Sequence, residues 1–175
     1  NLEIVNCGNT AGSNGIQADS DDAIIENVRV SKCHKGISVG GSGVWIGNST
    51  VTNNYAYGIN IYAGDSSTSA VKVYNNVVSW NTNYGIRSVE DDTIIKSNVI
   101  RNNSKGIYLN DADDVVISDN TIADSNQNIH VYSNCDRVLI KNNIVSDADS
   151  NGMFFDGVDS DYIVIEGNTI KDNGD

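Results

Sequence analysis

The fold of this chain is decided by the stretch Asp114-Val115-Val116-Ile117-Ser118-Asp119-Asn120-Thr121-Ile122. Its apolar residues come in short β-branched runs broken by small polar residues, which is typical of strands and turns. A polar turn follows at residues 123–127, and the next strand begins Asn128-Ile129-His130-Val131. Because alternate residues of a strand face opposite sides, Ile129 and Val131 are expected to point inward and His130 outward.

This pattern repeats along the chain. Seven short apolar runs each follow an anchor residue, and the anchors are Gly15, Gly36, Gly58, Gly85, Gly106, Asn128 and Gly152. The steps between them are 21, 22, 27, 21, 22 and 24 residues. A second series keeps nearly the same step and consists of Asn76, Asn98, Asn120, Asn143 and Asn168. Self-similarity at a fixed period indicates a repeat architecture.

The length of the period decides which architecture. Helical repeats need about 33 residues or more, whereas about 22 residues rich in Val, Ile and Asn make one turn of a parallel β-helix. We therefore expect an all-β fold, a right-handed parallel β-helix (solenoid) of about seven rungs, since parallel crossovers are almost always right-handed. Residues 1–175 are expected to form a single domain within a longer protein, because neither end carries a capping helix.

Two files of apolar side chains are expected to fill the core. The first holds the inward pairs behind the anchors, from Ile16 and Ala18 to Met153 and Phe155, and the second holds Ile25, Ile46, Val73, Ile95, Ile117, Ile140 and Ile165. The Asn series is expected to lie at an inward turn, where each amide bonds to the neighbouring rungs. Val28 and Ser49 occupy that position earlier, so the ladder should begin at the third rung.

The composition limits the kinds of partner that the chain is expected to bind. The net charge is −12 with only 11 Lys and Arg, which argues against nucleic acid, because phosphates are neutralised by clustered cations. No apolar run approaches the about 18 residues of a membrane helix, so the chain is not expected to be transmembrane. Proline is absent, which suits strands that use every backbone N–H.

The cysteines do not indicate a disulfide framework. The chain has three cysteines, an odd number, and they lie at positions that do not correspond from one repeat to the next: Cys7, Cys33 and Cys135. Pairing of Cys7 with Cys33 across neighbouring rungs is an alternative to the favoured state, a buried thiol. His34 beside Cys33 lacks two further ligands for zinc, so no metal site is assigned.

Aspartates recur in the turns at similar positions of the repeat. They form the groups Asp19, Asp21 and Asp22; Glu90, Asp91 and Asp92; Asp111, Asp113 and Asp114; and Asp156, Asp159 and Asp161. Calcium binds several carboxylates at once, which makes it a candidate ligand. Asp is also a common turn residue, and the glycine-rich calcium nonapeptide is absent. Solvated turns are therefore favoured, and no cofactor is expected apart from this calcium alternative.

The outward face of the glycine-anchored strands is the candidate binding surface. It combines aromatic rings with amides and charges, as sugar-binding surfaces do, although aromatics are also common strand residues. An insertion at residues 62–69 adds a loop beside it, and solenoid insertions often lie on a binding face. The candidate substrate-binding residues are Tyr57, Asn60, Tyr62, Tyr84, Glu90, Asn110, Tyr132, Phe154 and Asp156.

Three outward residues on successive rungs are candidates for catalysis. Arg87 can neutralise a sugar carboxylate, His130 can take a proton, and Tyr108 can return one or protonate the leaving oxygen. Arg87, Tyr108 and His130 are therefore the predicted catalytic residues.

The opposite sheet presents an apolar row where polar residues are expected. We name Ile24, Trp45, Ile94, Val116, Leu139 and Val164 the apolar stripe, which Lys72 interrupts. Rows of this size rarely face solvent, so either a second copy of the chain or a segment of the longer protein is expected to pack on it.

The repeats Val115–Ile122 and Asn103-Ser104-Lys105-Gly106-Ile107-Tyr108-Leu109 resemble the right-handed parallel β-helix repeats of the pectate-lyase-like superfamily, in particular those of NosD and of bacterial mannuronan epimerases. The resemblance covers essentially the whole chain. It implies polysaccharide lyases, hydrolases and epimerases, phage tailspikes, adhesins and surface-layer proteins. The epimerase signature Tyr-Gly-Phe-Asp-Pro-His is matched only in its first two residues, Tyr84-Gly85, so no catalytic residue is carried over.

Two functions are therefore predicted. The first is an extracellular polysaccharide-binding or polysaccharide-processing β-helix, which as an enzyme would be a lyase, an epimerase or a glycoside hydrolase. The alternative is a stalk, adhesin, surface-layer or tailspike β-helix without catalysis. Both place the protein outside the cell, at the cell surface or in the periplasm.

Overall fold

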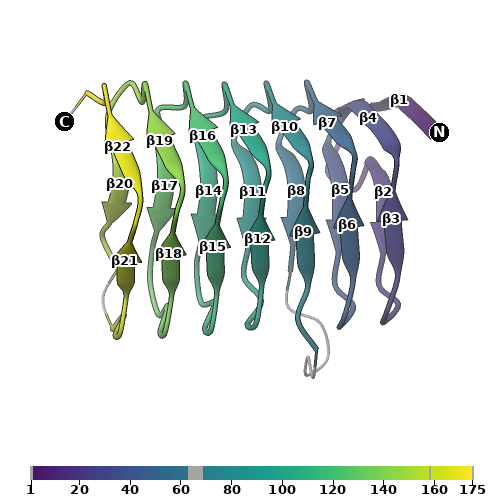
Figure 1. Ribbon diagram of the computed structural model, residues 1–175. Coiled ribbons are helices and arrows are strands. Elements are labelled where there is room, and N and C mark those ends of the chain that lie inside the picture. Colours follow the sequence, from purple (N-terminus) through teal and green to yellow (C-terminus); the bar gives the residue numbers. More distant parts are fainter. Residues whose placement is uncertain (1, 63–68, 158, 175) are drawn as a thin grey trace.

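The computed structural model describes residues 2–62, 69–157 and 159–174 as one stack of coils (Figure 1), in which the two termini lie at opposite ends. Among these residues there is no helix, and the strands of each sheet pair in parallel. The predicted all-β solenoid is therefore confirmed. No helix of the described chain is long and apolar enough to cross a membrane.

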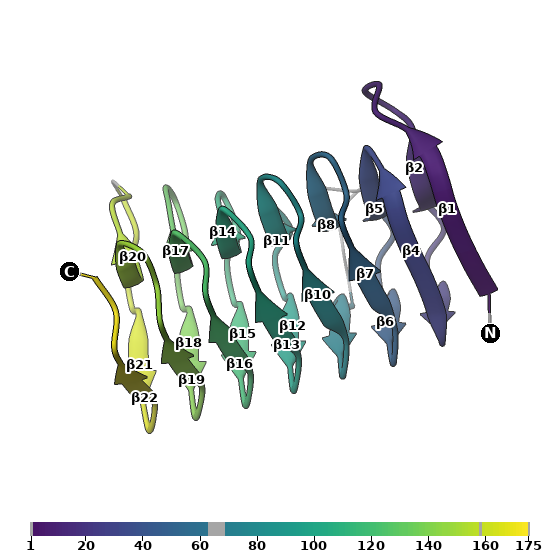
Figure 2. The ribbon, with the colours of Figure 1, turned by 90° about the horizontal axis from the view of Figure 1, so that it is seen from above.

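Seven coils each contribute one strand to each of three sheets, which we name A, B and C (Figure 2), and β22 (Thr169–Lys171) adds an eighth strand to sheet A. Sheet A consists of β1 (Leu2–Gly8), β4 (Val28–Cys33), β7 (Thr50–Thr52), β10 (Val77–Ser79), β13 (Val99–Arg101), β16 (Thr121–Ala123), β19 (Ile144–Ser146) and β22 (Thr169–Lys171). Sheet B consists of β2 (Asn14–Ala18), β5 (Lys35–Val39), β8 (Tyr57–Ile61), β11 (Tyr84–Ser88), β14 (Lys105–Leu109), β17 (Gln127–Val131) and β20 (Asn151–Phe155). Sheet C consists of β3 (Ile24–Glu26), β6 (Trp45–Gly47), β9 (Lys72–Tyr74), β12 (Ile94–Lys96), β15 (Val116–Ser118), β18 (Leu139–Lys141) and β21 (Val164–Glu166).

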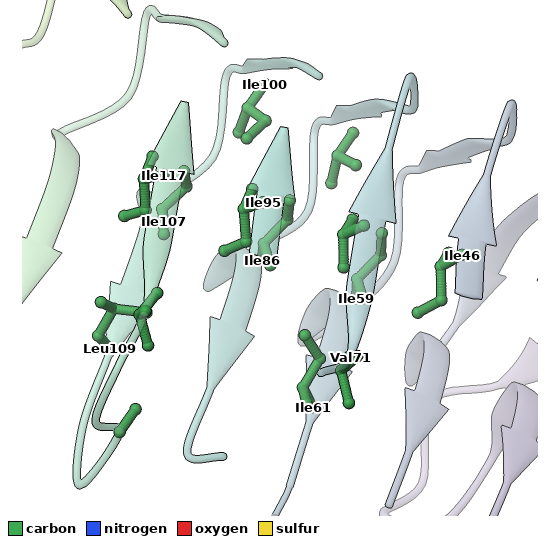
Figure 3. Close-up of a cluster of buried hydrophobic side chains, with 14 of the residues drawn as sticks. Ile46, Ile59, Ile61, Val71, Ile86, Ile95, Ile100, Ile107, Leu109 and Ile117 are labelled. Carbon is green, nitrogen blue, oxygen red and sulfur yellow. The ribbon is translucent and has the colours of Figure 1, made fainter. Parts of the chain in front are cut away.

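The core is a column of stacked aliphatic side chains, as Figure 3 shows for its central coils. Ile59, Ile86 and Ile107 from sheet B are fully buried, as are Ile95 and Ile117 from sheet C. Sheet A supplies a third file that the sequence analysis did not separate, including Val78, Ile100 and Ile122. Both predicted inward files are thus confirmed in the middle of the stack.

The expected burial is wrong in the last coil. Phe155 is 38% exposed and Ile165 is 47% exposed. Their strands, β20 and β21, are the last of their sheets, so no further described rung covers them. A solenoid side chain is buried by the coils on both sides of it, and the inward direction alone does not bury it.

The predicted asparagine ladder is present at the corner between sheets C and A. The backbone N–H of Asn98 donates to Asn120 Oδ1 at 2.9 Å, and the amide of Asn98 donates to the same atom at 3.0 Å. The same pattern joins Asn76 to Asn98 and Asn143 to Asn168. Ser49 continues the row with its hydroxyl, which accepts the N–H of Val28.

A second ladder at the corner between sheets A and B was not predicted. The backbone N–H of Asn54 donates to Asn81 Oδ1, and that of Asn81 donates to Asn103 Oδ1. In both corners the residue before the ladder asparagine has a positive φ, as at Asn75 (56°) and Trp80 (58°). A left-handed residue turns the chain and the next side chain then points inward, so both corners have the same local design.

Asn128, the anchor residue that is not a glycine, replaces glycine for a local reason. The second ladder has Ser125 and Ala148 in consecutive coils, so the amide is missing there. Asn128, in the anchor position, supplies it: its Oδ1 accepts the N–H of Ser125, and its amide donates to Ser146 O at 2.7 Å. Asn128 therefore replaces the glycine anchor where Ala148 offers no side-chain acceptor to the N–H of Ser125.

Strands β1 and β4 are also linked by a disulfide. Cys7 and Cys33 are bonded, with their Cα atoms 4.5 Å apart. The favoured expectation of free thiols is therefore wrong for this pair, because adjacent parallel rungs bring the two cysteines together. Cys135 remains a buried free thiol, and burial raises its pKa.

Candidate functional site

The outward face of sheet B, which we name the site face, collects most of the predicted site residues. Parallel register places Arg87 beside Tyr108, and Tyr108 beside His130, on β11, β14 and β17. Asn60 lies beside Arg87 on β8. The three predicted catalytic residues therefore form one row across successive coils, while their catalytic role stays a prediction.

Four tyrosines form a stacked column along the site face. The rings of Tyr57 and Tyr84 lie 5.1 Å apart at 8°, and those of Tyr84 and Tyr108 lie 4.6 Å apart at 9°. Tyr132 continues the column 6.1 Å from Tyr108. Neighbouring rings thus cover both faces of Tyr84, so the inner rings offer edges and hydroxyls to a ligand rather than open faces.

The phenols of Tyr84 and Tyr108 remain protonated near neutral pH. Burial raises the pKa of Tyr108 to about 12, and it also raises the pKa of Tyr84. A protonated phenol donates a hydrogen bond but is a weak acid at neutral pH. The geometry therefore favours hydrogen bonding by Tyr108 over proton transfer.

His130 points outward as predicted, but it is buried on this face. It is 4% exposed, because the rings of Tyr108, Tyr132 and Phe154 surround it at 5.0–5.8 Å. Its Nε2 lies 2.8 Å from Asp156 Oδ1, and its Nδ1 is buried without a partner. Since a carboxylate only accepts hydrogen bonds, Nε2 carries the proton, and Nδ1 holds an unused lone pair.

The burial of His130 makes stability depend on pH. Burial lowers the pKa of His130, and the bond to Asp156 partly opposes this. Below about pH 6.5 the unfolded chain takes up a proton that the folded chain resists, so stability falls as the pH drops.

We expect the difference in unfolding free energy between wild type and His130→Gln to shrink between pH 7.5 and 5.5, as measured by urea denaturation. A difference that stays constant over this range contradicts the assignment, since His34 is common to both proteins and cancels.

Three cations line the tyrosine column. Lys105 Nζ lies 5.0 Å from the Tyr108 ring centre and 5.7 Å from that of Tyr84. Lys35 Nζ and the Arg87 guanidinium lie 5.8 and 5.9 Å from the Tyr57 ring centre. Burial lowers the pKa of Lys105. A chain of net charge −12 thus concentrates positive charge on its site face.

A groove of about 560 Å³ lies on the N-terminal part of the site face. It is lined by Ala11, Gly12, Asn14, Gln17, His34, Lys35, Ser38, Tyr57, Asn60, Tyr62 and Arg87. The Asn60 amide donates to Ser38 Oγ, and Arg87 Nη1 donates to Asn60 Oδ1, both at 3.1 Å. Two buried polar atoms of these lining residues, Asn14 Oδ1 and His34 Nδ1, have no hydrogen-bond partner.

The groove contains residues that the sequence analysis did not place in the site. Gln17 and Ser38 precede Asn60 and Arg87 in the same outward file, and Lys35 precedes Tyr57 in another. Continuing each file toward the N-terminus identifies them. Asn14 continues the file of Lys35 and Tyr57, and His34 lies directly before β5.

Other predicted site residues are placed less favourably. Glu90 is only 8% exposed and lies in a turn whose backbone bonds to Ser88 and Thr93. Asn110 donates to its neighbour Asp111. Tyr62 bonds through its hydroxyl to Asp19 and closes one side of the groove. The rest of the predicted inserted loop, residues 63–68, lies outside the described residues.

The aspartate-rich turns mainly satisfy backbone groups. Asp113 Oδ1 accepts the N–H of Asp136 at 2.8 Å, and Asp136 Oδ1 accepts that of Asp161 at 2.6 Å. Arg137 pairs with Asp113 and Asp114. In the described part of the chain, no three His, Cys, Asp or Glu side chains gather in a way that could hold a metal ion. The calcium alternative stays a prediction.

Comparison with known proteins places this architecture in a family. The family model described as a right handed beta helix region matches residues 63–175, which is more than half of the chain. The chain therefore belongs to this family, and the predicted resemblance in fold is confirmed. A search among curated proteins finds no match.

Two solved structures share the fold. The A-module of the mannuronan C-5 epimerase AlgE4 from Azotobacter vinelandii superposes with a TM-score of 0.74 at 19% identity, over 90% of this chain and 52% of that module. The Dettilon tailspike protein superposes with a TM-score of 0.73 at 18% identity, over 94% of this chain and 39% of the tailspike. The chain thus spans about half or less of these structures, and at such identity the likeness establishes the fold alone.

Proposed function

We propose that the site face binds a carbohydrate polymer in the groove above β2, β5, β8 and β11. The observation that carries the proposal is the groove itself: amides, a hydroxyl and a guanidinium line its floor, beside Tyr57 and Tyr62. Sugars are recognised by such a combination of hydrogen-bonding groups and aromatic walls.

The repetition of the fold supports a polymeric ligand. Gln17, Ser38, Asn60 and Arg87 occupy equivalent positions in four successive rungs. Groups repeated about every 4.8 Å along the stack can meet a ligand that is itself repetitive. One of the two similar structures is an epimerase of mannuronan, which is such a polymer.

Binding is better supported than catalysis. Of the predicted catalytic residues, His130 has one ring nitrogen engaged by Asp156 and the other buried. Tyr108 has a pKa of about 12. Arg87 reaches the groove, and we assign it to ligand binding. Lyase, epimerase or hydrolase activity on a bound polymer stays a prediction for a longer protein.

We also propose that the protein works in an oxidising compartment, at the cell surface, outside the cell or in the periplasm. The Cys7–Cys33 disulfide supports this, because such bonds persist mainly where thiols are not kept reduced.

A glycan array followed by calorimetry with the best oligosaccharide tests the proposal. We expect Asn60→Ala and Arg87→Ala each to weaken binding about tenfold, because each removes a hydrogen-bonding group from the groove floor. Arg101→Ala is the matched control, since Arg101 is an exposed arginine on sheet A, and it should bind like wild type. An array without any hit, or equal losses in all three variants, overturns the assignment.

A further inference from the structure

The apolar stripe predicted on sheet C is a continuous row in the structure. Strand register aligns Ile24, Trp45, Lys72, Ile94, Val116, Leu139 and Val164 across the seven strands. Ile24 is 72% exposed and Val164 is 48% exposed, while the other apolar members are half-buried. We number the strands of sheet C as coils 1 to 7, from β3 to β21.

The two ends of the stripe have complementary shapes. Coil 1 presents the protruding side chain of Ile24. Coils 6 and 7 form an apolar depression of about 410 Å³, lined by Arg137, Val138, Leu139, Tyr162 and Val164. Two copies can place both protrusions on both depressions at once only if one copy is turned end for end.

A second outward file runs beside the stripe and carries charges. Its members are Glu26, Gly47, Tyr74, Lys96, Ser118, Lys141 and Glu166 in coils 1 to 7. In coil 2 Trp45 stacks on Tyr74 at 4.8 Å and lies over Gly47, where a Cβ would come within 2.5 Å of its Nε1. Glu26 and Glu166 thus lie at the two ends of this file, Lys96 and Lys141 lie between them, and the aromatic pair occupies coils 2 and 3.

We propose that sheet C pairs face to face with sheet C of a second copy, around a two-fold axis parallel to the strands. In this arrangement the coils of the copies run in opposite order, each file faces its own copy, and coil 1 faces coil 6. Such an interface is self-complementary, so each contact occurs twice. The equal spacing of rungs keeps the two faces in step along their length.

Charge complementarity selects this register. Facing coils 1 and 6 put Glu26 opposite Lys141 and bring Ile24 onto Leu139 at the depression. Facing coils 3 and 4 put Tyr74 opposite Lys96, an arrangement in which a cation approaches an aromatic ring. Opposite charges thus meet, and the protruding side chain enters the depression.

Shifting the copies by one coil in either direction loses these contacts. If coil 1 faces coil 7, Glu26 meets Glu166 and Lys96 meets Lys96 of the second copy. If coil 1 faces coil 5, Lys72 meets Lys72 across the axis. Like charges placed opposite each other disfavour both alternatives, so of these three registers the one with coil 1 on coil 6 is the one without facing like charges.

The interface is small. Six coils extend about 29 Å and the two files are about 7 Å apart along the strand, so the facing area is well below the about 800 Å² per partner of a standard specific interface. We therefore expect a weak dimer with a dissociation constant on the order of 100 micromolar. This affinity places the dimer within reach of sedimentation measurements.

Sedimentation velocity of the 175-residue chain over a wide concentration range tests the pairing. We expect a monomer–dimer equilibrium that Leu139→Glu weakens about 100-fold, because the substitution buries a charge at two symmetric contacts. Ile144→Glu is the control, since Ile144 is an exposed aliphatic residue of the same coil on sheet A; it should dimerise like wild type. Circular dichroism confirms that both variants are folded.

Charge reversal tests the register. Glu26→Lys and Lys141→Glu should each weaken the dimer about tenfold, and the double variant should restore it. Glu166→Lys should have no effect, whereas it strengthens the dimer if coil 1 faces coil 7. A chain that stays monomeric at millimolar concentration, a dimer indifferent to Leu139→Glu, or a double variant without recovery overturns the proposal.

Discussion

Replacing Asn120 by alanine is expected to lower the free energy of unfolding by about 3 kcal/mol. Asn120 Oδ1 accepts the backbone N–H and the side-chain amide of Asn98. Its own amide donates to Ile95 O at 2.9 Å and to Asn143 Oδ1 at 3.0 Å. Alanine leaves the backbone N–H of Asn98 buried without its acceptor and removes both bonds of the Asn120 amide, whereas the Asn98 amide keeps Val73 O and Lys96 O. Urea denaturation followed by circular dichroism measures the loss.

Two further substitutions show whether the ladder is responsible. Asn126 is an exposed asparagine in the turn after the same coil, so Asn126→Ala should change stability by less than about 0.5 kcal/mol. Asn120→Ser should lose less than Asn120→Ala, because Ser49 and Ser125 already accept ladder hydrogen bonds in this chain. Equal losses for Asn120→Ala and Asn126→Ala would show that the ladder does not stabilise the fold.

Replacing Gly85 by valine is expected to cost at least about 3 kcal/mol of unfolding free energy, or to prevent folding. A Cβ at this position would lie 2.6 Å from the backbone oxygen of Gly106 and 2.9 Å from the Asn103 amide. The first of these atoms belongs to the neighbouring rung and cannot rotate away. Moving this oxygen would disturb the backbone hydrogen bonds between the strands of sheet B, so the loss of stability would extend beyond the substituted coil.

Gly47→Ala is the matched control for this steric argument. A Cβ there meets only the side chain of Trp45 among its three nearest atoms, and a surface side chain can shift. We therefore expect a small change in stability together with a change in Trp fluorescence, since Trp45 stacks on Tyr74. If Gly47→Ala destabilises the chain as much as Gly85→Val, crowding by the backbone is not what requires the glycine anchors.

Much of the candidate site could be predicted because residues at equivalent positions of successive repeats become neighbours in a solenoid. Arg87, Tyr108 and His130 stand at equivalent positions of their repeats, and parallel register places them side by side. The same logic locates Tyr57, Asn60 and Tyr84. It does not give the contacts of Glu90, which is only 8% exposed, or of Asn110, whose amide donates to Asp111.

What the sequence determined by itself was everything that repeats. The step of about 22 residues, the inward aliphatic files and the asparagine series from Asn76 to Asn168 are local patterns, and stacking on an identical neighbour needs no further information. The position of the apolar stripe follows from the same alternation.

Only the tertiary structure decided what each outward side chain meets. Whether the tyrosines offer faces or edges depends on the stacking of Tyr84 between Tyr57 and Tyr108, and His130 is buried by rings from three different strands. Strand alternation specifies the side of the sheet, whereas burial and protonation arise from the sum of neighbours in adjacent coils. The second corner ladder and the third sheet likewise emerge only when left-handed residues such as Asn75 and Trp80 turn the chain, because the repeat period is the same for two sheets as for three.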